Sequence, residues 1–398
     1  YQAGDKAIPF KIVGEFSGAE LEGVRYEQLL PYVQPTDGDA FKVITGDFVT
    51  TEDGTGIVHT APSFGADDFK VARQHGIGSL TLVDLRGRFV TEVKDTVFGF
   101  SGEYVKEQYL NEDEKAVELA LQKEHLKHII PNLEKYMSVD ERIALKLKVE
   151  GKAFKIEKYE HTYPHCWRTD KPILYYPLDS WFIKSTAVKD RLIELNKTIH
   201  WKPESTGTGR FGNWLENLQD WNLSRSRYWG IPIPIWTSED RSEQTVISSV
   251  EQLRAEIEKS VAAGFMSSNP LAGFVPGDMS EENYLRFDLH RPYADDIYLV
   301  SKSGQKMKRE SDLIDVWFDS GAMPYAQWHY PFENKDLVDS GKAFPADFIA
   351  EGVDQTRGWF FTLHAIGTMV FDSVAFKNVV SNGLVLDKNG NKMSKRLG

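Results

Sequence analysis

The stretch at residues 348–359, FIAEGVDQTRGW, constrains the fold of this chain more than any other. It reads as a strand that ends at an acidic residue and turns through glycine into an apolar helix, expected from Asp354 to about Phe371. Doubly wound α/β sheets are built from such units, and they bind their ligands outside the carboxyl ends of the strands. We therefore expect an α/β domain with a ligand site near Glu351.

A lysine pair close to the end of the sequence complements this stretch. Lys392 and Lys395 follow the turn-forming residues 387–390, DKNG. Each ammonium group is a compact charge with three donors, so a loop of this kind can close over phosphate groups. The alternative is a plain solvated turn. The sequence has no Walker-type lysine loop and no Gly-x-Gly-x-x-Gly that opens a helix.

The chain of 398 residues is long enough for two or three domains. Its first 100 residues read as β-rich, with short strand candidates at 41–44, 48–51, 57–59 and 80–83. Helical spacing is expected at 66–75 and 111–129. Strands and helices alternate in the second half, with helices at 187–196 and 249–263. We expect domains at 1–178 and 179–398, the second carrying an inserted module at about 237–300.

Charge and composition narrow the class of protein. The net charge of −12 argues against a general coat for nucleic acid, although a local basic groove is compatible with it. No apolar run reaches the roughly 18 residues that a membrane span needs. The single cysteine, Cys166, suits a reducing compartment, and Thr169 stands where a Cys-x-x-Cys pair would continue, so we expect no zinc site. The sequence starts without methionine, and we expect an internal fragment of a longer protein.

Another candidate site lies in the β-rich half, where Gly54, Thr55 and Gly56 precede His59 and Asp68. The glycines let backbone approach a ligand closely. The histidine can orient a hydroxyl or a water, and the carboxylate can hold an amino group. These residues fit recognition of an α-amino ester. The structural alternative is a strand, a turn and a helix whose first turn carries acids because the helix dipole favours them.

Aromatic and arginine motifs mark the second half. Residues 220–230, DWNLSRSRYWG, combine two arginines with stacking aromatics, which serve phosphate, carboxylate or nucleic acid equally well. The alternative is a core wall or an interface with paired arginines. Residues 315–321, DVWFDSG, read as the end of a strand with an aromatic beside a glycine turn. Trp317 and Trp359 can then line two walls of a small hydrophobic pocket.

Together these motifs resemble a known family. Residues 392–396, KMSKR, resemble the KMSKS loop of the class I aminoacyl-tRNA synthetases, with Arg396 in place of the last serine. Residues 351–359, 315–321 and 224–230 resemble the isoleucine-specific members in particular. Residues 54–68 resemble the editing-pocket motif of the same enzymes. The resemblance covers nearly the whole chain in the expected order, apart from the charged stretch at about 131–150.

The resemblance implies a Rossmann-type catalytic domain split by an editing insertion. Residues 1–178 would be the editing domain without its N-terminal part, and residues 179–398 the second half of the catalytic domain up to the lysine loop. The enzyme would join isoleucine to ATP and transfer it to tRNA(Ile), with Mg²⁺ accompanying ATP. Glu351 and Gln355 would hold the aminoacyl-adenylate, with Gly352 and Asp354 near its ribose.

Further roles follow from the same resemblance. Trp317 and Trp359 would wall the isoleucine side chain, and Lys392 and Lys395 would stabilise the ATP phosphates as charge develops. Gly54, Thr55, Gly56, His59 and Asp68 would belong to the hydrolysis of misattached valine, with Asp68 gripping its amino group. A monomeric cytoplasmic enzyme is expected.

Two departures from the family pattern accompany the resemblance. The sequence contains no His-Ile-Gly-His motif, and the threonine-rich segment of the editing pocket is also missing. We therefore expect the 398 residues alone to be inactive in synthesis. The rival interpretations are a valine- or leucine-specific synthetase, a free-standing editing or tRNA-binding module, and a non-enzymatic relic.

Overall fold

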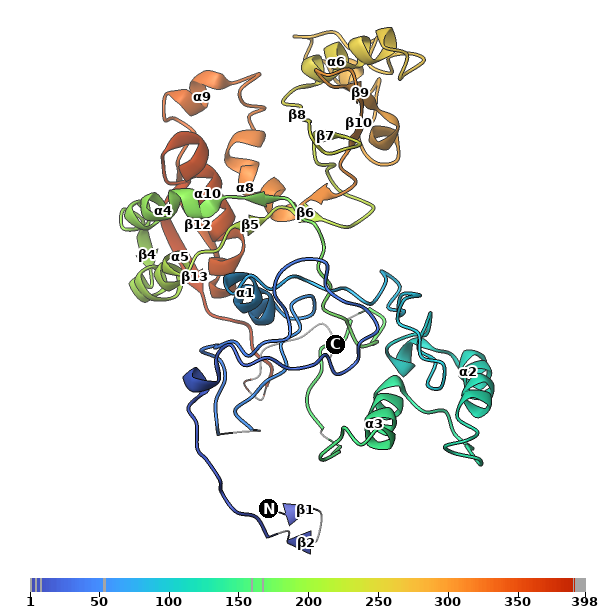
Figure 1. Ribbon diagram of the computed structural model, residues 1–398. Helices are drawn as coiled ribbons and strands as arrows, with labels where there is room; N and C mark the ends of the chain where they lie inside the picture. Colours follow the sequence, from blue (N-terminus) through green and yellow to red (C-terminus); the bar gives the residue numbers. More distant parts are fainter. Residues whose placement is uncertain are drawn as a thin grey trace. The chain divides into compact units, whose positions relative to one another are not determined.

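The structure is a computed structural model that describes residues 2–3, 6–7, 9–52, 55–158, 160–166, 168–388 and 390. The chain divides into two compact units, residues 1–178 and 179–398. Helices and several sheets occur together along the chain, so the predicted α/β class is confirmed (Figure 1).

Helices supply most of the regular structure described in the first unit. They are α1 (Ala66–Gln74), α2 (Glu112–His125) and α3 (Val139–Val149), with 3₁₀ turns at Gly18–Leu21 and Glu107–Tyr109 and two-residue strands β1 (Gln2–Ala3) and β2 (Lys6–Ala7). Both α2 and α3 begin with a capping box, in which Asn111 or Ser138 exchanges hydrogen bonds with the glutamate three residues later. The helices predicted at 66–75 and 111–129 are confirmed.

The strands predicted at 41–44, 48–51, 57–59 and 80–83 are wrong. Within the described part of these stretches, pairing is limited to isolated bridges, such as Lys42 with Arg25 and Val83 with Phe89. Phe41 has a φ of 59°, which breaks the extended backbone at the start of the first candidate. The frequent Gly and Asp residues favour turns over ladders, so this unit is built mainly of hydrogen-bonded loops.

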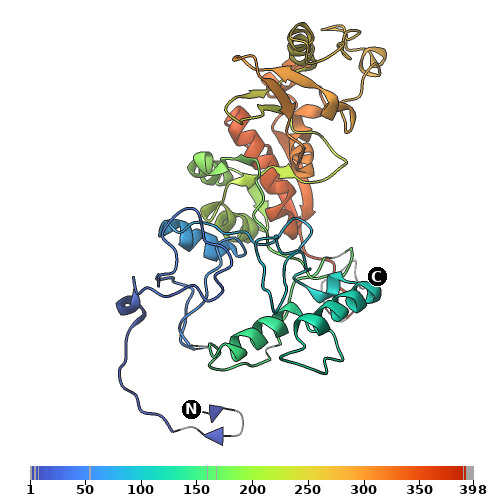
Figure 2. The same ribbon diagram turned by 45° about the vertical axis from the view of Figure 1, so that its right-hand side comes forward.

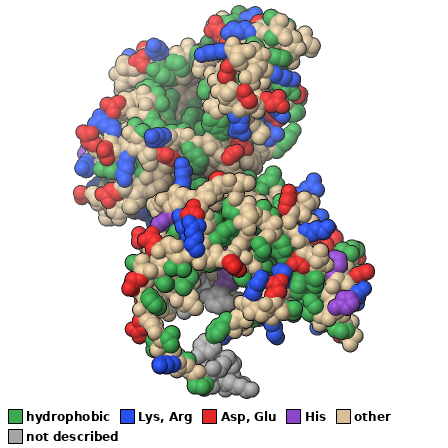
Figure 3. Space-filling view, viewed as in Figure 1, with side chains coloured by type: hydrophobic (Ala, Val, Ile, Leu, Met, Phe, Trp, Pro, Cys, Tyr) green, Lys and Arg blue, Asp and Glu red, His purple; other side chains and the backbone are tan. Residues whose placement is uncertain are grey.

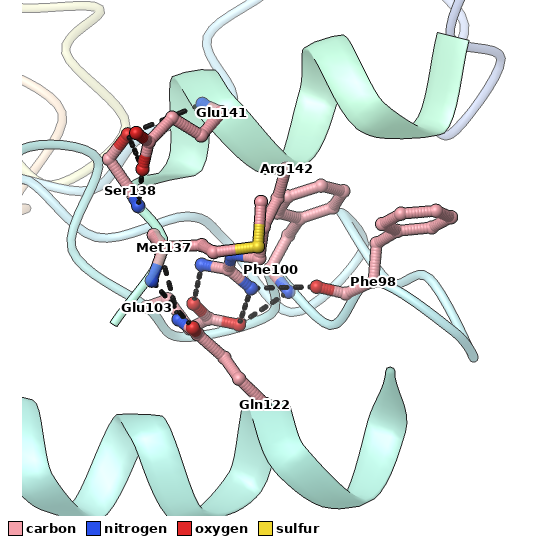
Figure 4. Close-up of polar contacts among 8 residues, drawn as sticks. All are labelled: Phe98, Phe100, Glu103, Gln122, Met137, Ser138, Glu141 and Arg142. Carbon is pink, nitrogen blue, oxygen red and sulfur yellow. Dashed lines mark hydrogen bonds and ion pairs between the residues drawn. The ribbon is translucent and has the colours of Figure 1, made fainter. Parts of the chain in front are cut away.

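A buried ion pair holds the core of the first unit together (Figure 4). The Arg142 side chain is 1% exposed, and its guanidinium pairs with the Glu103 carboxylate. One of its nitrogens also donates to the Phe98 carbonyl at 2.7 Å, and the group lies 5.2 Å from the centre of the Phe100 ring. The surrounding apolar core contains Val93, Phe98, Phe100, Leu126 and Val139.

A parallel sheet of three strands forms the centre of the second unit. Its order is β12 (Ala346–Gly352), β13 (Phe376–Asn382) and β4 (His200–Lys202). Helix α10 (Trp359–Phe371) connects β12 to β13 and lies beside the sheet in both views (Figures 1 and 2). All residues from 360 to 368 are buried, as expected for a helix that is apolar on every side.

Shorter elements surround this sheet. They are β3 (Phe182–Ile183), a 3₁₀ turn (Ser185–Val188), α4 (Lys189–Asn196), the π-helix η4 (Thr206–Phe211), α5 (Gly212–Glu216), β5 (Trp221–Asn222), β6 (Ser224–Arg225), β11 (Leu313–Ile314), α8 (Val316–Ala326) and α9 (Lys335–Asp339). The glycine turn expected at 315–321 is wrong, because Asp315 caps α8 and residues 316–321 are helical. Gly321 is needed there for close packing, since a Cβ atom would lie 3.0 Å from Thr362 and Ile366.

The inserted module has a sheet and a core of its own. Antiparallel strands lie in the order β8 (Gln244–Val246), β7 (Ile235–Ser238), β10 (Lys306–Arg309) and β9 (Tyr298–Val300). The remaining elements are α6 (Val250–Ala262), α7 (Glu281–Tyr284) and a 3₁₀ turn at Tyr293–Asp296. Strand β10 returns to pair with β7, so the module continues beyond residue 300 to residue 309. Its core residues are Trp236, Ile247, Leu253, Ile257, Leu271, Ile297, Leu299 and Met307.

Acidic and basic side chains are interspersed on the face drawn in Figure 3 and do not gather into one basic patch. In the part of the chain that the structure describes, no helix has the length and apolar character of a membrane span.

Candidate functional site

The first candidate site begins where β12 ends. Glu351 and Gly352 are its last residues, and they pair in parallel register with Ser381 and Asn382 of β13. The carboxyl ends of two neighbouring parallel strands therefore meet at one edge, where a doubly wound sheet binds its ligand. The chain continues into the 3₁₀ turn η6 (Val353–Arg357). The side chains of Glu351 and Asp354 are exposed there, so both carboxylates are accessible to a ligand.

Two tryptophans that are distant in sequence come together beside this turn. The Gln355 side-chain oxygen accepts a hydrogen bond from the backbone N–H of Trp359 at 3.0 Å. The indole N–H of Trp359 donates to the Ser320 carbonyl of α8 at 2.9 Å. Gly358 lies against the Trp317 ring, since a Cβ atom there would be 3.3 Å from it. Trp317, Gln355 and Trp359 thus form one cluster, with Trp317 39% exposed.

The sequence-based search missed an acidic residue in this region. Asp319 lies in α8 near the capping residue Asp315. Burial, followed by repulsion from Asp315, raises the pKa of its carboxyl group. One of its oxygens is buried and has no hydrogen-bond partner within the described residues. The signal available in the sequence was an acid among apolar neighbours in a helix, but that stretch was interpreted as a turn.

The motif at 220–230 has a buried part around Trp221 and an exposed part around Trp229. Asp315, which is 4% exposed, accepts hydrogen bonds from Arg225 at 2.7 Å and from the Trp221 indole at 3.2 Å. This half of the motif fits the structural alternative, a core wall with a paired arginine. Trp229 is 69% exposed and stacks on His290 with ring centres 4.6 Å apart.

Lys392 and Lys395 lie outside the described residues, which end at Gly390. Their predicted contact with phosphate groups stays a prediction.

The second candidate site lies in the first unit, at the start of α1. An Asp68 side-chain oxygen accepts a hydrogen bond from the backbone N–H of Ala61 at 3.2 Å, so this carboxylate closes the loop before the helix. His59 is exposed, and no hydrogen bond or ion pair joins it to Asp68 among the described residues. Gly56 has a φ of +75°, which a side chain rarely adopts. The same loop holds Thr55, whose hydroxyl donates to the Ile57 carbonyl, while Gly54 lies outside the described residues.

Cys166 occupies a tight turn. Its backbone N–H donates to the Lys171 carbonyl, and its carbonyl accepts from Asp170, both at 2.8 Å. Hydrogen bonds, led by that from the Thr169 hydroxyl, lower the pKa of the thiol. The described residues hold no group of three or more His, Cys, Asp or Glu side chains suited to a metal ion. The expectation that the chain binds no zinc stays a prediction.

Comparison with known proteins identifies the class. Residues 19–398 match the family of class I tRNA synthetases for I, L, M and V, and the chain belongs to this family. Among its relatives is an isoleucine–tRNA ligase of Bacteroides fragilis strain YCH46, which is 65% identical across the whole chain. Enzymes of the same name from Cytophaga hutchinsonii and Clostridium tetani are 63% and 45% identical over 100% and 98% of the chain.

The chain spans only part of these relatives, namely 35%, 34% and 32% of their respective lengths. A solved structure with local likeness is the ternary complex of the Agrobacterium radiobacter K84 agnB2 LeuRS with tRNA and LeuAMS. It is 22% identical and covers 46% of this chain and 22% of its own, with a TM-score of 0.30.

Proposed function

We propose that this chain is part of an isoleucine–tRNA ligase. The enzyme would activate isoleucine with ATP, releasing pyrophosphate, and would then pass the aminoacyl group to tRNA(Ile). The observation that carries the proposal is the end of β12, where exposed Glu351 and Asp354 adjoin the cluster of Trp317, Gln355 and Trp359. Relatives named isoleucine–tRNA ligase, up to 65% identical to the chain, support the choice of amino acid.

The geometry suggests a role for each group at this edge. The Glu351 carboxylate can accept a hydrogen bond from the ammonium group of isoleucine, and Gln355 can hold the adenylate. On the family pattern, Gly352 and Asp354 would face the ribose. Glycine suits position 352, because a Cβ atom there would lie 2.6 Å from an Asp354 oxygen and crowd that carboxylate. The Trp317 and Trp359 rings would contact the isoleucine side chain. Their partly apolar surroundings suit a small hydrophobic ligand.

The lysine pair and magnesium belong to the activation step. The isoleucine carboxylate attacks the α-phosphorus of ATP, and pyrophosphate leaves with its added negative charge. Lys392 and Lys395 would stabilise that charge, and Mg²⁺ would arrive with ATP as part of the substrate. The parallel strands β12 and β13, joined through α10, support the proposal of a Rossmann-type arrangement.

Editing of misattached valine is the second part of the proposal. A pocket shaped for isoleucine rejects valine by one methylene, worth about 1–3 kcal/mol, a figure known from isoleucine-specific synthetases and not from this chain. A second pocket is therefore needed. In the loop before α1, Asp68 would grip the amino group of valine while His59 orients the ester or a water. The glycines at 54 and 56, with Thr55, would let backbone approach the ribose.

The experiment is amino-acid-dependent ATP–pyrophosphate exchange by the intact protein that contains this chain. The proposal expects isoleucine to support exchange at the highest kcat/KM, with weaker activity for valine and still less for leucine. A preference for valine or leucine would refute isoleucine as the substrate but would still agree with a class I aminoacyl-tRNA synthetase. Absence of exchange with all three would refute synthetic function. The 398 residues alone, which contain no His-Ile-Gly-His motif, are expected to be inactive in this assay.

Partners and location complete the proposal. tRNA(Ile), isoleucine and ATP are the expected partners, and we expect a monomeric enzyme that works in the cytoplasm. Gel filtration of the intact protein with and without tRNA(Ile) tests the oligomeric state and the tRNA contact together.

A further inference from the structure

A π-helix lies beside η6, the turn that follows β12 in the first candidate site, which is the proposed nucleotide site. η4 spans Thr206–Phe211 and connects β4 with α5, and the backbone N–H of Gly212 donates to the Gly207 carbonyl five residues earlier. π-helical turns are wider than α-helical turns, are rare, and occur frequently at functional sites. The extra residue in such a turn changes the direction in which the following side chains point.

Neighbouring side chains hold this turn in its wide form. The Gly207 carbonyl also accepts a hydrogen bond from the side chain of Asn196, at 3.1 Å. Asn196 is 8% exposed, and it accepts in turn from the Trp201 indole at 2.9 Å. A Cβ atom at position 207 would lie only 2.2 Å from the Trp201 ring, so glycine is required there. The π-helix is therefore fixed by buried contacts on the side of β4.

The opposite side of the π-helix contacts the turn that follows β12. Arg210 donates through its Nε to the Thr356 hydroxyl at 2.9 Å. Thr356 is completely buried, and its hydroxyl donates to the Val353 carbonyl at 2.9 Å. The first bond links the π-helix to η6, and the second joins Thr356 to the first residue of η6. One turn further on, the Trp214 ring lies 5.2 Å from the guanidinium of Arg357.

We propose that Arg210 is a positioning residue for the nucleotide site, and that the π-helix exists to place it. Its bond to Thr356 fixes η6, and with it Asp354 and Gln355, relative to the end of β12. This assignment of the ligand rests on the proposed function. The mechanical part of the inference, in which Arg210 orders η6 through Thr356, rests on the geometry alone.

The test uses the intact protein and a double-mutant cycle. Arg210→Ala and Thr356→Val are made singly and together, with Thr356→Ser as the conservative variant and Arg286→Ala as the control. Arg286 is a suitable control because its guanidinium also donates a single hydrogen bond of 2.9 Å to a residue distant in sequence, the Gly273 carbonyl, but it lies in the inserted module. ATP–pyrophosphate exchange gives KM for ATP and kcat. Hydrogen exchange at the amides of residues 353–358 reports the order of η6 independently of any substrate.

Arg210→Ala is expected to raise KM for ATP about tenfold with kcat within about twofold, because the lost contact acts on ground and transition states alike. Thr356→Val should do the same, and the double variant should add nothing further. Thr356→Ser and Arg286→Ala should resemble the wild type. Amides 353–358 should exchange faster in Arg210→Ala.

Additive effects in the double variant, or unchanged exchange of amides 353–358 in Arg210→Ala, would overturn the inference. An unchanged KM for ATP together with faster amide exchange would overturn its link to the nucleotide. If the wild-type protein shows no isoleucine-dependent ATP–pyrophosphate exchange, the proposed function is refuted instead. Hydrogen exchange at amides 353–358 would still decide whether Arg210 orders η6.

Discussion

Replacement of Arg142 by methionine tests how the first unit is stabilised. The side chain is 1% exposed, and its loss leaves the Glu103 carboxylate and the Phe98 carbonyl without their partner. Breaking one side of a buried ion pair costs about 3–5 kcal/mol. Glu103 is 15% exposed and still accepts from the Phe100 N–H at 2.7 Å, so we expect the lower end, about 3 kcal/mol.

The assay exploits the uneven distribution of tryptophan. Nine of the ten tryptophans lie in residues 179–398, so tryptophan fluorescence reports mainly on the second unit. Hydrogen exchange of the α3 amides in increasing urea reports on the first. Arg142→Met should lower the free energy of opening measured at the α3 amides and leave that measured at the α10 amides unchanged. The double variant Arg142→Met/Glu103→Gln should lose less, because no carboxylate then remains unpaired.

An exposed pair supplies the matched control. Arg25 and Asp39 form an ion pair at 2.6 Å, but their side chains are 63% and 51% exposed. Arg25→Met should therefore change stability by no more than about 0.5 kcal/mol. If Arg142→Met costs no more than Arg25→Met, the buried ion pair does not hold the unit together, and the reasoning fails.

Three further predictions concern acid stability and the two sites. Burial raises the pKa of Asp95, but the N–H groups of Phe98 and Val97 and the Lys146 ammonium outweigh it and bring the value to about 2. This contribution, about 2–3 kcal/mol, is complete above the unfolded pKa of about 3.9 and is lost as pH falls towards 2. The free energy of unfolding in urea should therefore depend less on pH between 5 and 2 in Asp95→Asn than in the wild type. Gly358→Ala would put a Cβ atom 2.7 Å from the Gln355 oxygen, and it should raise KM for isoleucine several-fold in pyrophosphate exchange by weakening a bond worth about 1 kcal/mol. Lys395→Ala in the intact protein should lower kcat of the same exchange by about 10²-fold with little change in KM for isoleucine, and an unchanged kcat would contradict its role at the phosphates.

The sequence predicted those parts of the fold that depend on neighbouring residues. Helix α10 was expected from its apolar residues, but it begins at Trp359 and not at Asp354, because residues 353–357 form the 3₁₀ turn η6. The helix at Ser249–Ala263 was expected from its helical spacing, and the structure places α6 within one residue of those limits. The strands at 41–83 failed because positive φ angles and loop hydrogen bonds, which depend on the folded context, replaced the ladder. Local propensity does not contain that information.

In the first candidate site, too, features set by neighbouring residues were predicted and contacts between distant residues were not. Glu351 was expected at the end of a strand, and β12 ends at the next residue, Gly352. Contacts between residues far apart in sequence were beyond local patterns, among them the bond from Trp359 to Ser320 and that from Arg210 to Thr356, 146 positions away. The π-helix that presents Arg210 has no composition signal except glycines, which serve many other purposes.

The central claim is that the end of β12 and η6 hold the isoleucyl-adenylate. The most direct measurement is hydrogen exchange of the intact protein with a saturating non-hydrolysable isoleucyl-adenylate analogue. We predict slower exchange at residues 351–359 and no change in strands β7 to β10 of the inserted module. Saturated binding that leaves residues 351–359 unprotected would contradict the account, because the ligand would then lie elsewhere.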